Sequence, residues 1–135
     1  MKLLQSILLF LVTGLSLAAD ENAAISHAVD ARIAMLQAES WQLDSAIYAL
    51  TNLELTENEK FELIAEAGFR VTEETLAGYG FTLKQLYAFE AEYQAAITAW
   101  LEAHPDQAYL LTTLENEIES RQNQFEQVIG LGTSQ

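Results

Sequence analysis

Apolar residues recur every third or fourth position between Asn22 and Leu53, and this spacing predicts a long amphipathic helix. The stripe consists of Val29, Ile33, Leu36, Leu43, Ile47 and Leu50, with Ser40 in the remaining position. Trp41 and Tyr48 are seven residues apart beside this stripe, so we expect them to widen the apolar face. A wide face favours a helix that packs against two or more neighbours.

A second, shorter helix is predicted directly after the first. Thr56 and Glu59 have the spacing of a capping box, which marks a helix start. Apolar residues at positions 61, 63, 64 and 67 give this helix about three turns, and Gly68 is expected to end it. The segment from Gly68 to Phe81 is expected to be irregular, with at most a turn or two of helix capped by Thr72.

Two more long helices are predicted in the second half of the chain. Thr82 and Gln85 form another capping box, and the third helix is expected to run from Leu83 to about Ala103. Pro105 suits the first position of a fourth helix, because its missing N–H is not needed there. The apolar stripe of that helix is Leu111, Leu114, Ile118, Phe125 and Val128, and Gly130 is expected to end the helix.

These elements predict an all-α fold, a small helical bundle of about four helices, three long and one short. A glycine- and aromatic-rich irregular segment separates the second and third helices. The bundle domain is expected to cover residues 19–130, and residues 131–135 are expected to be a disordered tail.

The first eighteen residues have the layout of a secretory signal peptide. Lys2 precedes an apolar run from Leu3 to Leu17, and small residues at 16 and 18 predict cleavage after Ala18, with Ala19 as the alternative position. The alternative is a retained membrane anchor, but the run is shorter than the roughly 20 residues that a spanning helix needs. We therefore expect a periplasmic or secreted bacterial protein that is not inserted in a membrane after cleavage.

The charge of the chain bears on its partners. Removing residues 1–18 takes away Lys2 and no acid, so the processed chain has five basic and twenty acidic residues, a net charge of −15. Such a chain repels nucleic acid and anionic lipid and attracts basic proteins. The alternative is that the acidity serves only solubility. The chain has no cysteine, so disulfides, thiolate metal sites and cysteine catalysis are excluded.

No pattern in the chain points to an enzyme, a cofactor or a metal site. Motifs for nucleophilic hydrolysis, metalloproteases, phosphate loops, di-iron sites and covalent haem are missing from the sequence. His27 is expected to face water, and His104 to cap a helix junction beside Pro105. Glu90 and Arg121 are the acid and base expected on core faces, so we predict that they form a structural ion pair.

A partner-binding surface is predicted in the irregular segment. Aromatic side chains on a glycine-punctuated loop can anchor another protein. The residues proposed for this surface are Phe69, Glu73, Glu74, Tyr79 and Phe81, with Tyr79 the one expected to be most exposed. The alternative is that the aromatic residues plug the end of the bundle.

The sequence therefore suggests an exported, non-catalytic helical bundle that binds another protein. An inhibitor or immunity-type protein for a basic partner fits the charge. A periplasmic chaperone or stress holdase, or a small ligand- or metal-binding bundle, are the alternatives.

Overall fold

A computed structural model describes residues 2–66 and 69–130, with side chains described for 19–65 and 72–130. The described residues form six helices and no strand, so the all-α prediction is confirmed. The helices are α1 (Lys2–Asn52), α2 (Glu57–Glu66), α3 (Phe69–Ala77), α4 (Leu83–Glu92), α5 (Gln94–Ala103) and α6 (Pro105–Val128). The prediction of about four helices is wrong at two places, which are described below.

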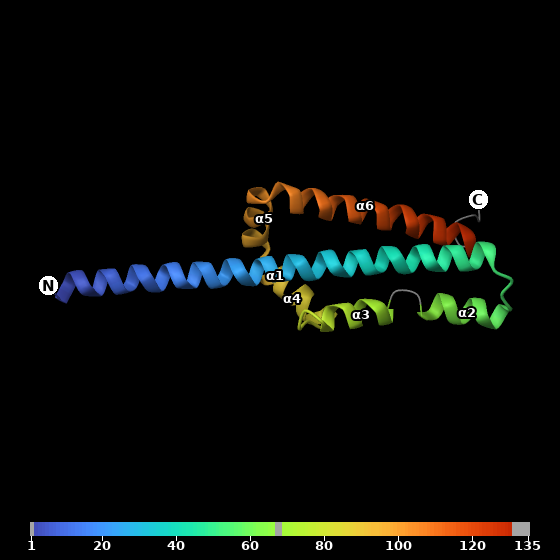
Figure 1. Cartoon of the computed structure of the whole chain (residues 1–135), viewed down its shortest axis with the longest axis horizontal. Coiled ribbons are helices and arrows are strands. Elements are labelled where there is room, and N and C mark those ends of the chain that lie inside the picture. Colours follow the sequence, from blue (N-terminus) through green and yellow to red (C-terminus); the bar gives the residue numbers. More distant parts are fainter. Residues whose placement is uncertain (1, 67–68, 131–135) are drawn as a thin grey trace.

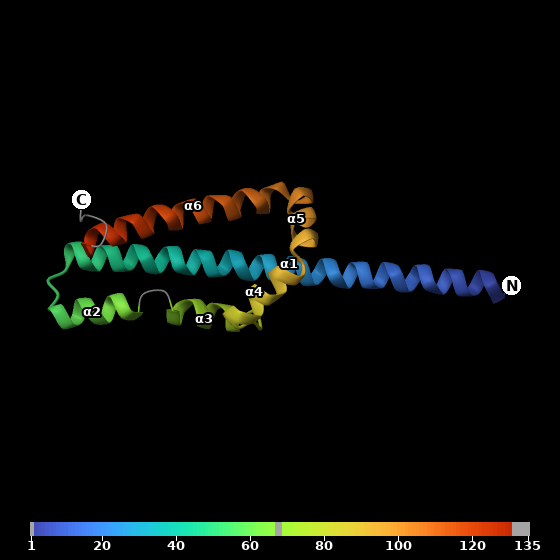
Figure 2. The same cartoon turned by 180° about the vertical axis from the view of Figure 1, so that it is seen from behind.

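The long helix α1 is the rod around which the others are arranged. In Figure 1, α6 lies along one side of α1, and α2 and α3 lie along the other. Helix α5 stands across the end of this layer and leads into α6. Figure 2 shows α4 crossing α1 on one face, so the helices wrap three sides of the rod.

The core forms where the predicted stripe of α1 meets α3, α4 and α6. Most of the stripe is buried, and the most deeply buried large side chains are Ile25, Leu76 and Leu86. Helix α6 adds Leu111, Leu114 and Ile118 to this core, at the positions expected from its heptad spacing. The periodicity of both long helices therefore predicted most of the packed positions, but Val128, at the end of the α6 stripe, is 42% exposed.

Two aromatic residues of α1 do not widen its apolar face as expected. Trp41 is 65% exposed and Tyr48 is 62% exposed. At 3.6 residues per turn, both lie roughly 120–140° around the helix from Leu36. They belong to a face that no other helix of the described chain covers.

The expected irregular segment is mostly helical. Helix α3 runs from Phe69 to Ala77, with Thr72 inside it and not at its start. Its end is made by the backbone N–H groups of Tyr79 and Phe81, which both donate to the carbonyl of Leu76, at 2.9 and 3.0 Å. Gly80 has φ +80, which a side chain disfavours, so the irregular part shrinks to a tight turn. The helix end expected at Gly68 lies outside the described residues.

The expected third helix is divided into α4 and α5 at Tyr93, whose φ and ψ are −106° and 24°. Neither proline nor glycine causes this bend. The bend allows Phe89 before it, and Ile97 and Trp100 after it, to pack against the same core.

The two predicted capping boxes are both present. Thr82 Oγ1 accepts from the Gln85 N–H at 3.1 Å, and Gln85 Oε1 accepts from the Thr82 N–H at 2.9 Å. Thr56 and Glu59 make the same reciprocal pair at the start of α2, at 3.2 and 2.8 Å. These caps fix the start of α2 and α4 as predicted.

Candidate functional site

The predicted aromatic surface is turned largely inward. Tyr79 and Phe81 are half-buried against the core. The His27 ring lies over both, with ring centroids 5.6 Å from Tyr79 and 5.7 Å from Phe81, and its Nε2 is 2.7 Å from the Tyr79 carbonyl oxygen. The Phe81 ring also contacts the Phe89 ring, with ring centroids 6.2 Å apart. These contacts hold the turn after α3 against α1. They favour the alternative hypothesis, in which the aromatic residues fill the end of the bundle and do not bind a partner.

The other members of the predicted surface do not complete it. Glu73 and Glu74 are exposed on α3, and Glu74 takes part in interactions within the protein. The side chain of Phe69 lies outside the described part of the chain. The structure thus brings Tyr79 and Phe81 together against α1 and leaves the two acids facing solvent.

The predicted Glu90–Arg121 ion pair does not form. Glu90 pairs with Arg32 of α1, whose Nη2 donates to Glu90 Oε1 at 2.5 Å and whose Nε donates to Oε2. Arg121 pairs with Asp44, Nε to Oδ1 at 2.6 Å. Both partners come from α1, because α1 lies between the helices that carry Glu90 and Arg121. The hydrogen bonds to Glu90 raise the pKa of Arg32 above its ordinary value.

Glu39 is a second half-buried acid on α1. Burial raises the pKa of its carboxyl group above the ordinary value, against the lowering effects of Arg32 and of a 3.4 Å hydrogen bond from Gln122 Nε2. The folded protein therefore binds this proton more tightly than the unfolded chain. Protonated Glu39 therefore contributes to the free energy of unfolding. This contribution is complete below the unfolded-state pKa of Glu39, and it is lost as the pH rises through the higher folded-state pKa.

We expect Glu39→Gln to stabilise the protein at pH 7, by up to about 1 kcal/mol, because the uncharged amide keeps the polar contact without the desolvated charge. The gain should disappear as the pH falls below the ordinary range of a glutamate pKa. Urea unfolding of both proteins at neutral and acidic pH measures this difference. A gain that grows on acidification would contradict the stated burial of Glu39.

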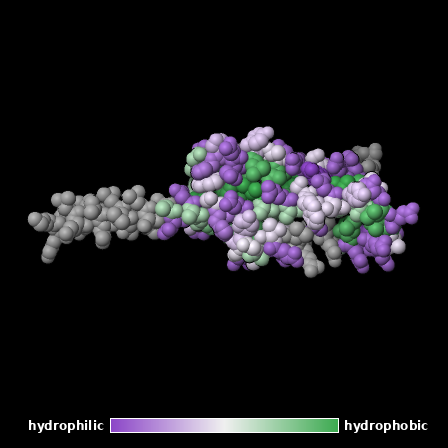
Figure 3. All heavy atoms as spheres, viewed as in Figure 1, coloured by the Kyte–Doolittle hydropathy of each residue, from purple (hydrophilic) through white to green (hydrophobic). Residues whose placement is uncertain are grey.

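An open apolar site lies where α1 and α6 end and α2 begins. The α1 stripe continues to Leu50, but α2 covers this end only loosely, since none of its described side chains is buried. Phe61 of α2 is 73% exposed, and Leu53, just after α1, is 52% exposed. Apolar side chains gather at this end of the molecule (Figure 3). Exposed apolar groups concentrated in one place indicate a binding surface.

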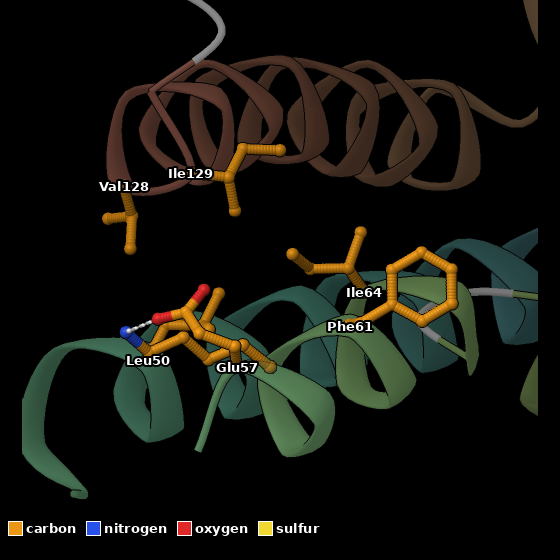
Figure 4. Close-up of a pocket in the computed structure, with 7 residues that line it drawn as sticks. Leu50, Glu57, Phe61, Ile64, Val128 and Ile129 are labelled. Carbon is orange, nitrogen blue, oxygen red and sulfur yellow. Dashed lines mark hydrogen bonds and ion pairs between the residues drawn. The ribbon is translucent and has the colours of Figure 1, made fainter. Parts of the chain in front are cut away.

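These side chains line a pocket, which we call the α2-end pocket. Its volume is about 360 Å³, and its lining residues are Leu50, Glu57, Lys60, Phe61, Ile64, Val128 and Ile129. Figure 4 shows Val128 and Ile129 at the end of α6 pointing toward Leu50 of α1 and Ile64 of α2, with open space between them. The volume is in the lower part of the range of ligand pockets.

The rim of the α2-end pocket is acidic. Glu57 lines the pocket, and Glu54, Glu59 and Glu62 are exposed on or just before α2, the helix that carries Glu57. Lys60 is the lone base among residues 53–65, and its Nζ lies 3.3 Å from Glu57 Oε1. An apolar floor with a negative rim favours a group that carries both apolar and positively charged parts.

Sequence reasoning missed this site, although part of a signal was present. Residues 53–64 hold five large apolar side chains, Leu53, Leu55, Phe61, Leu63 and Ile64, in and beside a helix of only ten residues. A helix that short cannot bury them all against one neighbour.

A second pocket lies between the start of the described α1 side chains and α5. It has a volume of about 480 Å³ and is lined by Glu21, Asn22, Ile25, Ala96, Ala99, Trp100, Ala103 and His104. The His104 ring stacks on Trp100 at 3.8 Å, and Nδ1 lies 2.7 Å from the Trp100 carbonyl oxygen. His104 therefore binds the end of α5, in keeping with its expected place at a helix junction.

Within the described ranges, no three His, Asp or Glu side chains lie close enough together to hold a metal ion. In the same residues, no helix combines the length and apolarity needed to cross a membrane. Comparison with known proteins gives no match to a family model, a curated protein or a solved structure.

Proposed function

We propose that this chain is an exported, non-catalytic binding protein that holds a basic polypeptide segment in the α2-end pocket. The observation that supports this proposal is the coincidence of an open apolar pocket with an acidic rim. The partner is expected to place one or two large apolar side chains in the pocket and lysine or arginine side chains over the rim. An inhibitor or immunity-type protein for a basic partner is one protein class with this property.

The shape of the pocket favours a polypeptide over an enclosed small molecule. Phe61 is mostly exposed and Val128 is 42% exposed, so a small ligand would leave much of the apolar surface in water. A helix or extended segment lying across α2 and the end of α6 would cover these side chains and also reach the rim. Apolar anchors surrounded by charged contacts are the usual arrangement of such interfaces.

The test uses three model peptides that form amphipathic helices. The first has leucine and phenylalanine on one face and lysine on the other, the second has glutamate in place of every lysine, and the third has serine in place of the phenylalanines. Fluorescence anisotropy should show binding of the first peptide only. Raising the salt concentration from about 0.05 to about 0.5 M should weaken this binding, because salt screens the attraction between opposite charges. Equal binding of the acidic peptide would contradict the proposal.

A matched pair of variants locates the binding site. Phe61→Ser should weaken binding of the basic peptide at least about tenfold, which is the effect of losing one anchor of roughly 1.4 kcal/mol or more. Tyr109→Ser is the control, because Tyr109 of α6 is 76% exposed but does not line the pocket. Equal losses in both variants would place the site elsewhere.

Export is part of the same proposal and has its own test. We expect that the chain, when expressed with residues 1–18 in a bacterial host, accumulates outside the cytoplasm as a species that begins at residue 19. Intact-mass measurement on the separated cell fractions determines this. Recovery of the full-length chain in the cytoplasm would contradict it.

A further inference from the structure

The face of α1 that carries Trp41 and Tyr48 has a regular composition of its own. Its positions alternate in steps of four and three, which is the spacing of a helix–helix seam. We call it the open seam, and its residues are Ala34, Ala38, Trp41, Ser45, Tyr48 and Asn52.

The open seam is not covered by another element of the described chain. Trp41, Ser45, Tyr48 and Asn52 are exposed, and the two alanines are half-buried. Helix α6 lies along one side of α1 and α3 along the other, and α4 crosses α1 (Figures 1 and 2). Asp44, beside the open seam, contacts Arg121 of α6, so α6 borders this face. Two large aromatic side chains, each more than 60% exposed, therefore stand on a face that α6 borders but leaves uncovered.

The open seam is uncharged on a strongly acidic chain. None of its six residues is acidic or basic, although the chain has a net charge of −14. Of the acids beside it, Asp44 is held by Arg121 at 2.6 Å, and the exposed Asp30 lies one turn before Ala34, outside the seam. Gln37 and Thr51 flank it without charge. A face that served only for solvation would be expected to carry the charges found on the rest of the surface.

The order of large and small side chains makes the open seam complementary to itself. If two copies lie antiparallel about a two-fold axis midway between Trp41 and Ser45, Trp41 of each faces Ser45 of the other. In the same register Tyr48 faces Ala38, and Asn52 faces Ala34. Every large side chain then meets a small one, which is the requirement for close helix packing.

We propose that the open seam is the interface of an antiparallel homodimer formed by two α1 helices. The seam spans nineteen positions, which is about 27 Å of helix at 1.5 Å per residue. Its burial would cover both exposed aromatic residues of each copy without bringing an unpaired acid into the interface.

The salt dependence separates this contact from the proposed peptide binding. Two copies with the same large negative charge repel each other, and salt screens that repulsion. Self-association should therefore strengthen as the salt concentration rises, whereas binding of the basic peptide should weaken. Failure of one proposal leaves the other standing.

The absence of cysteine from the chain allows a direct test of the register by crosslinking. The variants are Ala34→Cys and Asn52→Cys of the processed protein, which begins at residue 19. Facing positions of two helices packed 8–10 Å apart are within reach of a disulfide, so mild oxidation of an equal mixture should give a covalent dimer of one of each variant. Each variant oxidised alone should give little dimer, because 34 faces 52 and not itself.

Sedimentation velocity across protein and salt concentrations provides the second measurement. Trp41→Ser should raise the dimer dissociation constant at least tenfold, while Phe61→Ser and Tyr109→Ser should leave it unchanged. Circular dichroism checks that Trp41→Ser remains folded, as expected for a side chain that is 65% exposed. The proposal is overturned by a monomer at all concentrations, or by efficient crosslinking of each single variant with itself, which would indicate a parallel arrangement.

Discussion

Leu76→Ala is expected to lower the free energy of unfolding by about 2–5 kcal/mol, the range found when a fully buried leucine is truncated. The Leu76 side chain is 0% exposed, and its carbonyl accepts both hydrogen bonds that end α3. A cavity here would loosen the contact of α3 with α1 and the turn that carries Tyr79 and Phe81. Urea unfolding followed by circular dichroism measures the change.

The control for this prediction is Leu53→Ala, which removes the same atoms from a side chain that is 52% exposed. It should cost less than about 1 kcal/mol, because little of the side chain leaves contact with protein atoms. Similar losses in both variants would mean that Leu76 is not the centre of the core that the structure places around it.

Arg32→Met is expected to lower the free energy of unfolding by about 1–3 kcal/mol, because it leaves the Glu90 carboxylate half-buried without its partner. The Arg32 and Glu90 side chains are 25% and 24% exposed, so the loss should be smaller than for a fully buried pair. Arg32 also lies over the Tyr87 ring, at 5.8 Å from its centroid. Thermal and urea unfolding give the magnitude.

A double-mutant cycle isolates the pair itself. The variant with both Arg32→Met and Glu90→Leu should be more stable than the sum of the two single losses predicts, since neither charge is then left alone. Arg121→Met is the matched comparison: its partner Asp44 is 56% exposed, and the loss should be below about 1 kcal/mol. An Arg121→Met loss larger than that of Arg32→Met would contradict the two pairings.

The parts of the fold that could be predicted are those set by local pattern. The stripes of the predicted first and fourth helices fixed which faces of α1 and α6 are buried, and the Thr82 and Thr56 capping boxes fixed two helix starts. Helix α3 was missed because its three glycine neighbours suggested a loop. The structure uses Gly78 and Gly80 only for the turn after α3.

The break at Tyr93 and the ion pairs depend on tertiary structure. No local signal marks the bend, which arises because residues on both sides of it pack on one core. Glu90 and Arg121 were expected to pair with each other, but each pairs with a residue of α1. The ion-pair partners depend on which helices are neighbours in space. The sequence pattern of each single helix does not contain that information.

The α2-end pocket was missed for the same reason. Its lining comes from residue 50, residues 57–64 and residues 128–129, which meet only because α6 returns along α1. The aromatic turn at Tyr79 and Phe81 was favoured by composition alone. Its inward packing follows from the contacts of Tyr79 and Phe81 with His27 of α1, a residue far away in the sequence.

Hydrogen exchange tests the central claim most directly. The amide exchange of the processed protein is compared with and without a saturating concentration of the basic, phenylalanine-bearing peptide. Protection is expected in residues 53–65 and at the end of α6 around Val128, with little change in α4, α5 or the turn at Tyr79. Protection confined to the Tyr79 turn, or no protection at all from a peptide shown to be in excess, would contradict the account.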